Sequence, residues 1–111
     1  MKLEIIYDGN SNIVDITNVN DLKDYLFEYS GYFIPEDDEL AIELLQRNEF
    51  DDLINELETY FVKSFFEIAK DYFLTLKRIY SYKTIDEVKN EINKLNELYD
   101  KGGLGLKYII K

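Results

Sequence analysis

The fold depends on residues 50–80, which read FDDLINELETYFVKSFFEIAKDYFLTLKRIY. The run contains neither Gly nor Pro, and apolar residues recur at every third or fourth position from Phe50 to Ile79, which is the spacing of one helix face. It also holds eight of the seventeen Phe and Tyr residues, and a second apolar stripe joins the first from Val62 onward. The pattern predicts one long central helix, roughly 45 Å in length, that other elements cover on most sides.

Both ends of the chain predict strands. Residues 2–7 alternate as the two faces of a strand do, residues 8–12 form a turn that begins with Asp-Gly, and residues 13–17 return as a second strand. Residues 106–110 predict a terminal strand. Because a two-stranded hairpin alone is marginally stable, we expect the last strand to pair with the N-terminal hairpin.

Three further helices are expected around the central one. The first begins at a polar cap within residues 17–20, and Pro35 is expected to open the second. The buried face of the second helix is predicted to contain Leu40, Ala41, Leu44 and Leu45. Asn48 and Glu49 either separate this helix from the central one or lie within one continuous helix. The third helix begins at a capping box in residues 84–87, where Thr and Glu bond to each other's backbone N–H groups.

These elements predict a single domain over residues 1–111 with an α+β fold. The expected domain is mostly helical, with four helices of which one is long and central. A small antiparallel sheet from the N-terminal hairpin and the C-terminal strand packs on the helices. A chain of 111 residues is long enough to bury a core without disulfides or metals.

Several function classes are excluded because the chain has no Cys and no His. Thiol nucleophiles, Cys/His zinc sites and imidazole-based catalysis all need one of these side chains. We therefore expect a non-catalytic protein without a metal or cofactor. No apolar run of secretory or membrane-spanning length is found, so we expect a cytoplasmic protein that contacts no membrane.

The charge is distributed unevenly along the chain. Residues 1–60 carry 16 acidic and 3 basic side chains, whereas residues 61–111 carry 7 acidic and 10 basic ones, within a net charge of −10. An acidic field repels phosphate backbones and attracts basic surfaces. The sequence therefore argues against direct nucleic-acid binding and favours a basic protein partner, although acidity can also serve solubility alone.

The acidic side chains are densest in residues 36–58, which contain ten carboxylates. These are Glu36, Asp37, Asp38, Glu39, Glu43, Glu49, Asp51, Asp52, Glu56 and Glu58. A catalytic metal site needs several oxygens to converge on one ion, and no spacing here enforces that. The two remaining interpretations are a solvated helix face and a surface that occupies a cationic groove of another protein. For the second, the predicted contact residues are Glu36, Asp37, Asp38, Glu39, Glu43, Asp51, Asp52, Glu56 and Phe27.

Phe27 is included because it lies off the apolar face of its helix, and exposed aromatic side chains are frequent binding hot spots.

Three other patterns are weaker. Asp8, Asn10 and Asn12 match the start of an EF-hand calcium loop, but the Gly and Glu required later are absent. Glu67 and Asp71 lie four residues apart and could be a pair of acid–base carboxylates. Lys63 and Lys70 are equally near, however, and would form ordinary helix ion pairs with them. The glycines of residues 101–105 follow a helix and fit a helix end better than a phosphate-binding loop.

The combined sequence features predict a small acidic inhibitor that binds a basic, nucleic-acid-handling protein such as a nuclease. In size and charge, though in no motif, the chain resembles immunity proteins against nuclease toxins and the anti-defence proteins of phages. The alternative is a structural or oligomerisation module, in which the long aromatic-rich helix pairs with its copy in a homodimer.

Overall fold

The computed structural model describes all of residues 1–111 and contains five α-helices and one three-stranded antiparallel sheet. In chain order the elements are β1 (Lys2–Tyr7), β2 (Asn10–Asp15), α1 (Val19–Phe27), the 3-10 helix η1 (Ser30–Phe33), α2 (Glu39–Gln46), α3 (Phe50–Glu58), α4 (Lys63–Ser81), α5 (Ile85–Lys101) and β3 (Leu106–Ile110). The predicted α+β class and the small sheet are confirmed, whereas the number of helices is five instead of four.

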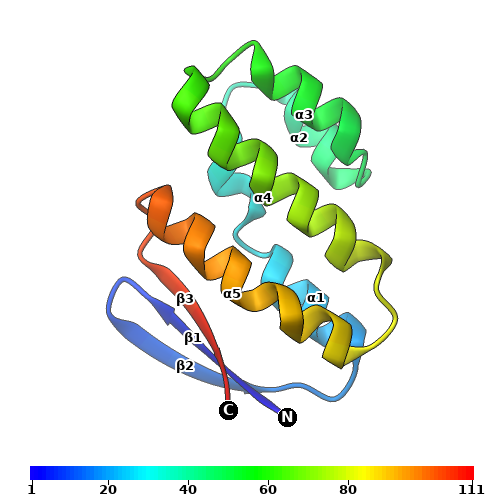
Figure 1. The fold of residues 1–111 in the computed structure, drawn as a ribbon, viewed down its shortest axis with the longest axis vertical. Coiled ribbons are helices and arrows are strands. Elements are labelled where there is room, and N and C mark those ends of the chain that lie inside the picture. Colours follow the sequence, from blue (N-terminus) through cyan, green and yellow to red (C-terminus); the bar gives the residue numbers. More distant parts are fainter.

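The elements are arranged along a molecule that measures 39 × 30 × 21 Å (Figure 1). The sheet and both chain ends lie at one end, and α5 packs on β3. Helix α4 contacts α1 and α5 on one side and α3 on the other. Helices α2 and α3 pack against each other at the end of the molecule opposite the sheet. The dense acidic segment is therefore far from the two termini.

The sheet has the strand order β2-β1-β3, so β1 is the central strand. It is paired with β2 from Lys2↔Asp15 to Tyr7↔Asn10 and with β3 from Leu3↔Ile110 to Tyr7↔Leu106. The turn between β1 and β2 is shorter than predicted and contains only Asp8 and Gly9, which have φ angles of 51° and 82°. Positive φ at both central residues matches the twist of the flanking strands, and Asp-Gly is a preferred pair for such a turn.

Aromatic side chains fill the middle of the core. Tyr72 on α4, Tyr99 on α5 and Tyr108 on β3 are all buried, and Phe33 of η1 lies 4.3 Å from Tyr72 between ring centroids. The Tyr72 and Tyr99 hydroxyl groups are 3.1 Å apart, and the Tyr108 hydroxyl donates to the Tyr25 carbonyl at 3.0 Å. Buried phenols need such partners, so these bonds help to fix how the helices and the sheet dock.

The prediction of one helix over residues 50–80 is wrong. The chain leaves the helical conformation after α3, and Val62 is extended with ψ of 151°. Tyr60 and Val62 are 53% and 73% exposed in the connecting turn. The break lets α3 fold back on α4, so that the apolar stripes on the two helices cover each other within one chain.

The second predicted helix also differs from expectation. Pro35 does not open α2, because its N-cap is Asp38 and the residues between them form a turn. Ala41 and Leu44 are buried as predicted, whereas Leu40 is 50% exposed. Asn48 has a φ of 56° and separates α2 from α3, which resolves the two alternatives for this junction. By contrast, the capping box of Thr84 and Glu87 is confirmed at the start of α5.

Candidate binding surface on the acidic hairpin

The acidic hairpin, residues 36–58, comprises the turn before α2, helices α2 and α3, and the junction between them. Each helix is amphipathic and buries one side, which leaves the acidic side chains on the other. The side chains that anchor the hairpin are Ala41, Leu44, Phe50, Leu53, Ile54 and Leu57. The hairpin is therefore a firmly packed element with an acidic outer surface, instead of a mobile charged loop.

Asp38 is the predicted contact residue that the structure removes from the surface. Only 3% of it is exposed, and its Oδ1 atom accepts the Ala41 N–H at 3.1 Å. This bond satisfies one of the free N–H groups at the start of α2. The other oxygen, Oδ2, is buried without a hydrogen-bond partner. The sequence pattern could not separate this capping carboxylate from its exposed neighbours Asp37 and Glu39.

The Asp38 carboxylate affects the groups around it. Burial raises the pKa of the half-buried Glu56, and the nearby Asp38 charge adds to the increase. The same charge is the main cause that raises the pKa of Tyr60. Like charges at short range disfavour a second ionisation. Asp38, Glu56 and Tyr60 therefore form an electronegative corner beside the turn that leads into α4.

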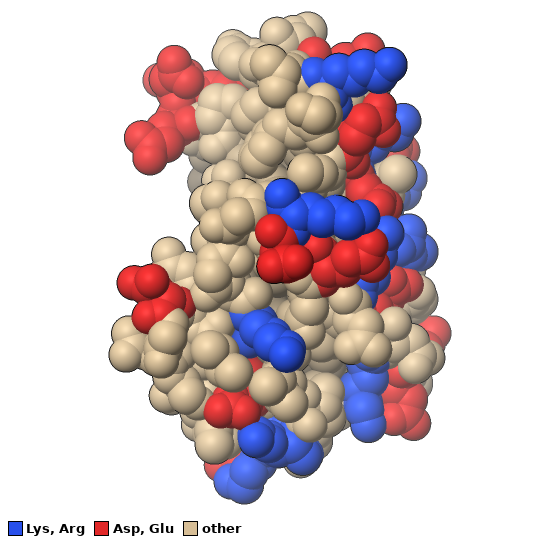
Figure 2. Space-filling model, turned by 60° about the vertical axis from the view of Figure 1, so that its left-hand side comes forward, with Lys and Arg blue, Asp and Glu red and all other residues tan.

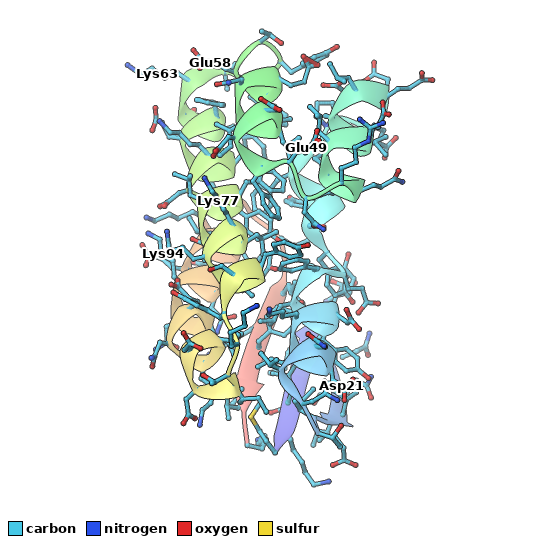
Figure 3. The ribbon with its side chains drawn as sticks, turned by 90° about the vertical axis from the view of Figure 1, so that its right-hand side faces the viewer. Asp21, Glu49, Glu58, Lys63, Lys77 and Lys94 are labelled. Carbon is cyan, nitrogen blue, oxygen red and sulfur yellow. The ribbon has the colours of Figure 1, made fainter.

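Most carboxylates of the hairpin have no cation beside them. Asp51 pairs with Lys77 of α4 at 2.8 Å, and Glu43 pairs with Arg47 one helical turn away. Seven others make no ion pair: Glu36, Asp37, Glu39, Glu49, Asp52, Glu56 and Glu58. All of them except Glu56 are exposed. In Figure 3, Lys77 lies on α4, whereas Glu49 and Glu58 mark the two ends of α3.

The charges elsewhere are more evenly balanced. Lys94 pairs with Asp71 at 2.9 Å and Lys101 pairs with Glu97 at 2.8 Å. On the face drawn in Figure 2, acidic and basic groups mostly lie next to each other, and the acidic groups that stand apart lie along the left-hand edge. The pair of Glu67 and Asp71 is therefore not isolated, because Asp71 is neutralised by a lysine from the neighbouring helix.

Phe27 does not occupy the position that the sequence suggested. It is half-buried and packs edge-on against Phe50, with ring centroids 6.4 Å apart. The ring therefore connects α1 to the start of α3. Leu22 and Leu26 of α1 are fully buried, whereas Phe27 packs against the core while partly exposed.

The exposed apolar residues near the hairpin were not predicted. They are Leu40 and Ile42 on α2 and Tyr60 and Val62 in the turn before α4. A hollow of about 350 Å³ lies beside Ile42, and its other lining residues include Ile34, Pro35, Glu36, Leu45 and Gln46. The only sequence signal was that Ile42 lies off the Ala41 and Leu44 face. Lys and Arg side chains, which have a long apolar stem and a cationic end, fit such a hollow.

The remaining candidate motifs have structural roles. Asp8 lies in the two-residue turn, and Gly102 and Gly103 end α5, where Gly103 has a φ of 75°. No group of three or more Asp or Glu side chains is placed to hold a metal ion. No helix combines the length and the apolar character needed to cross a bilayer.

The chain matches no known protein-family model, no curated protein and no solved structure. The interpretation of the acidic hairpin thus depends on its own geometry and charge.

Proposed function

We propose that this protein is a non-catalytic binding protein whose acidic hairpin docks on a basic surface of another protein. One observation carries the proposal. Seven carboxylates without ion pairs are held on one well-packed hairpin at the end of the molecule, although the adjacent helix α4 carries four cations, Lys63, Lys70, Lys77 and Arg78. A clustered field of this kind steers a basic partner and fixes its orientation.

The hollow beside Ile42 provides an anchor point within this surface. Its apolar lining residues Ile42, Leu45 and Pro35 suit the aliphatic stem of an Arg or Lys, and the lining carboxylate of Glu36 suits the charged end. Leu40 and Tyr60 add exposed apolar area nearby. Binding sites with a few apolar anchors inside a charged rim are typical of protein interfaces.

The partner class that best fits this surface is a nucleic-acid-handling protein such as a nuclease. Such proteins carry grooves of Lys and Arg that receive phosphates. Carboxylates spaced along two helices can occupy the same groove and exclude the nucleic acid. The protein would then act as an inhibitor, as immunity proteins and anti-defence proteins do, in the cytoplasm and without a cofactor.

The test combines affinity capture with matched variants. Bound proteins are captured with the tagged protein, identified by mass spectrometry, purified and titrated at several salt concentrations. The hairpin variant combines Asp37→Asn, Glu39→Gln and Asp52→Asn. The control variant removes three equally exposed carboxylates elsewhere through Asp24→Asn, Asp86→Asn and Asp100→Asn. Both variants lose the same net charge.

We expect the hairpin variant to bind at least about tenfold more weakly, which corresponds to about 1.4 kcal/mol. The control should stay within about twofold, and wild-type affinity should fall as salt rises. An affinity that is the same for both variants, or that does not depend on salt, would contradict the proposed docking surface. Equal melting temperatures would show that the difference does not come from unfolding.

The alternative, a homodimer through a long central helix, has less support than the sequence suggested. Its basis was the excess of aromatic side chains on residues 50–80. Helix α3 folds back on α4, and Phe66, Tyr72 and Phe73 are buried within the single chain. No long apolar helix face remains for a second copy to cover.

A further inference from the structure

The two edges of the sheet differ in whether their backbone groups are covered. At the β3 edge, the Tyr108 N–H donates to Asn96 Oδ1 at 2.9 Å, and the Tyr108 carbonyl accepts from Asn96 Nδ2 at 2.8 Å. The Asn96 amide of α5 therefore takes the place of a neighbouring strand. No comparable group lies along β2, which forms the outer edge of the sheet in Figure 1.

The strand pairing shows which groups of β2 point outward. The Ile16 N–H donates to the Met1 carbonyl at 2.7 Å, just beyond the last β1–β2 pair. Because bonding alternates along an antiparallel strand, Asn10, Asn12 and Val14 also bond to β1. The N–H and C=O groups of Ser11, Ile13 and Asp15 then point away from the sheet, and no other backbone hydrogen bond in the chain uses them.

Strand β2 lacks the features that usually protect an exposed edge. Its sequence, NSNIVD, has no Pro and no Lys, and its pairing with β1 runs from Lys2↔Asp15 to Tyr7↔Asn10 without a bulge. Its single charge, Asp15, is paired with Lys2 at 2.9 Å. Ile13 in the middle is 54% exposed. A flat edge with an exposed apolar centre is the kind that pairs with another strand.

We propose that β2 pairs with β2 of a second copy of this chain, in antiparallel orientation about a two-fold axis at Ile13. In this register Ile13 faces Ile13 of the second copy, and Ser11 faces the second copy's Asp15. All three outward residues of each copy then form paired N–H···O bonds, which extends the sheet to six strands. The facing pairs are apolar with apolar and hydroxyl with carboxylate, so no like charges meet.

Other registers are less favourable. A shift of the axis to Asp15 places two aspartates opposite each other, and a shift to Ser11 places Ile13 opposite Gly9. The acidic hairpin lies at the other end of each molecule, so the two hairpins stay apart (Figure 1). A single strand pair buries less than the roughly 1,200 Å² of a standard interface, so we expect a dimer in the micromolar range or weaker.

The first test is amide hydrogen exchange measured at increasing protein concentration, together with sedimentation. In a dimer the N–H groups of Ser11, Ile13 and Asp15 become protected as concentration rises. Three other N–H groups should be protected at every concentration. Those of Asn12 and Val14 bond to β1, and that of Tyr108 bonds to Asn96. Higher salt should strengthen the dimer, because it screens the repulsion between two acidic copies. A chain that stays monomeric up to millimolar concentration, with the Ser11, Ile13 and Asp15 amides unprotected, would overturn the proposal.

The second test uses charged substitutions at the axis. Ile13→Lys and Ile13→Glu each place two like charges opposite each other and should each abolish dimerisation. An equimolar mixture of the two should restore it as a heterodimer. Ile109→Lys is the matched control, because Ile109 lies on the same sheet face but on β3, whose edge is covered. Dimerisation that survives Ile13→Lys, or a mixture that stays monomeric, would contradict the axis at Ile13.

Discussion

Three buried tyrosines show how strongly single residues depend on their surroundings in this fold. Burial raises the pKa of Tyr99 to about 12, and burial also raises the pKa values of Tyr72 and Tyr108 above the ordinary value of 10.0. A buried phenolate would lose its hydration without a cation to replace it. The hydroxyl groups are therefore donors and acceptors of the core instead of titrating groups at neutral pH.

The consequence is a specific response to alkaline pH. These phenols hold their protons more firmly in the folded state than in the unfolded one. Their contribution to stability is then constant below about pH 10 and is lost as pH rises above that value, since the phenols of the unfolded chain ionise first. Absorbance titration should show these three tyrosines ionising only when the far-UV circular dichroism is lost.

One substitution tests the role of these phenols in the core. Tyr99→Phe should reduce only the part of the absorbance titration that accompanies unfolding, and it should destabilise the protein by about 1 kcal/mol because the Tyr72 hydroxyl loses a partner. If all ten tyrosines ionised near pH 10 without loss of structure, the core described above would be wrong.

At the scale of elements, the junctions of the helices determine how the acidic surface is shaped. Asn48 lies between α2 and α3 with a φ of 56°, and the Glu49 N–H next to it donates to the Leu44 carbonyl at 3.0 Å. A residue with a side chain is strained in this left-handed region, although Asn tolerates it better than most. The angle between the two acidic helices thus depends on one backbone conformation.

Substitutions at this junction should therefore have opposite effects. Asn48→Ala is expected to destabilise the protein by about 1 kcal/mol, because Ala is less favourable at positive φ. Asn48→Gly should be neutral or slightly stabilising, since Gly adopts this conformation readily. Urea unfolding measures both, and Asn90→Ala on the exposed face of α5 is the control, for which little or no loss is expected. Equal stability of the Ala and Gly variants would contradict the strain at Asn48.

The same scale explains what the sequence predicted and what it did not. The strands, the capping box at Thr84 and the amphipathic stripe of α5 are local patterns and were found, although β2 begins three residues earlier than predicted. The break before α4 has no Gly or Pro to mark it. The only signal in the sequence was the second apolar stripe that begins at Val62. That break is decided by tertiary packing, because two stripes on two helices can cover each other.

The candidate site was predictable to a similar degree. The acidic composition of residues 36–58 was evident, but exposure was not, because it depends on how α2 and α3 turn toward the core. Asp38 is buried as a cap, and Phe27 is half-buried against Phe50. Leu40 was predicted to be buried and is exposed. Ile42 is also exposed, and the periodicity had not assigned it to either face. The side chains that a partner can contact are thus determined by the packing of α2 and α3, and the sequence pattern alone does not identify them.

For the whole molecule, the unpaired carboxylates should oppose folding, because their repulsion is strongest in the compact state. Glu58 is a clear case. It is exposed in the last turn of α3, where the helix end is already negative, and it has no cationic partner. Glu58→Lys should therefore raise the free energy of unfolding by about 0.5–1 kcal/mol. Asp52→Lys makes the same change of charge in the first turn of α3, where a carboxylate is favourable, and should stabilise less or destabilise.

The two substitutions also separate a binding role from simple solubility. If the hairpin holds a basic partner, both should weaken that complex although they change stability by different amounts. A protein that keeps a destabilising carboxylate at Glu58 then does so for binding, as sites that favour function over stability do. Thermal melts give the first comparison and titration of the captured partner gives the second. If the Glu58→Lys variant is more stable and binds the partner as tightly as the wild type, the Glu58 carboxylate serves solubility alone.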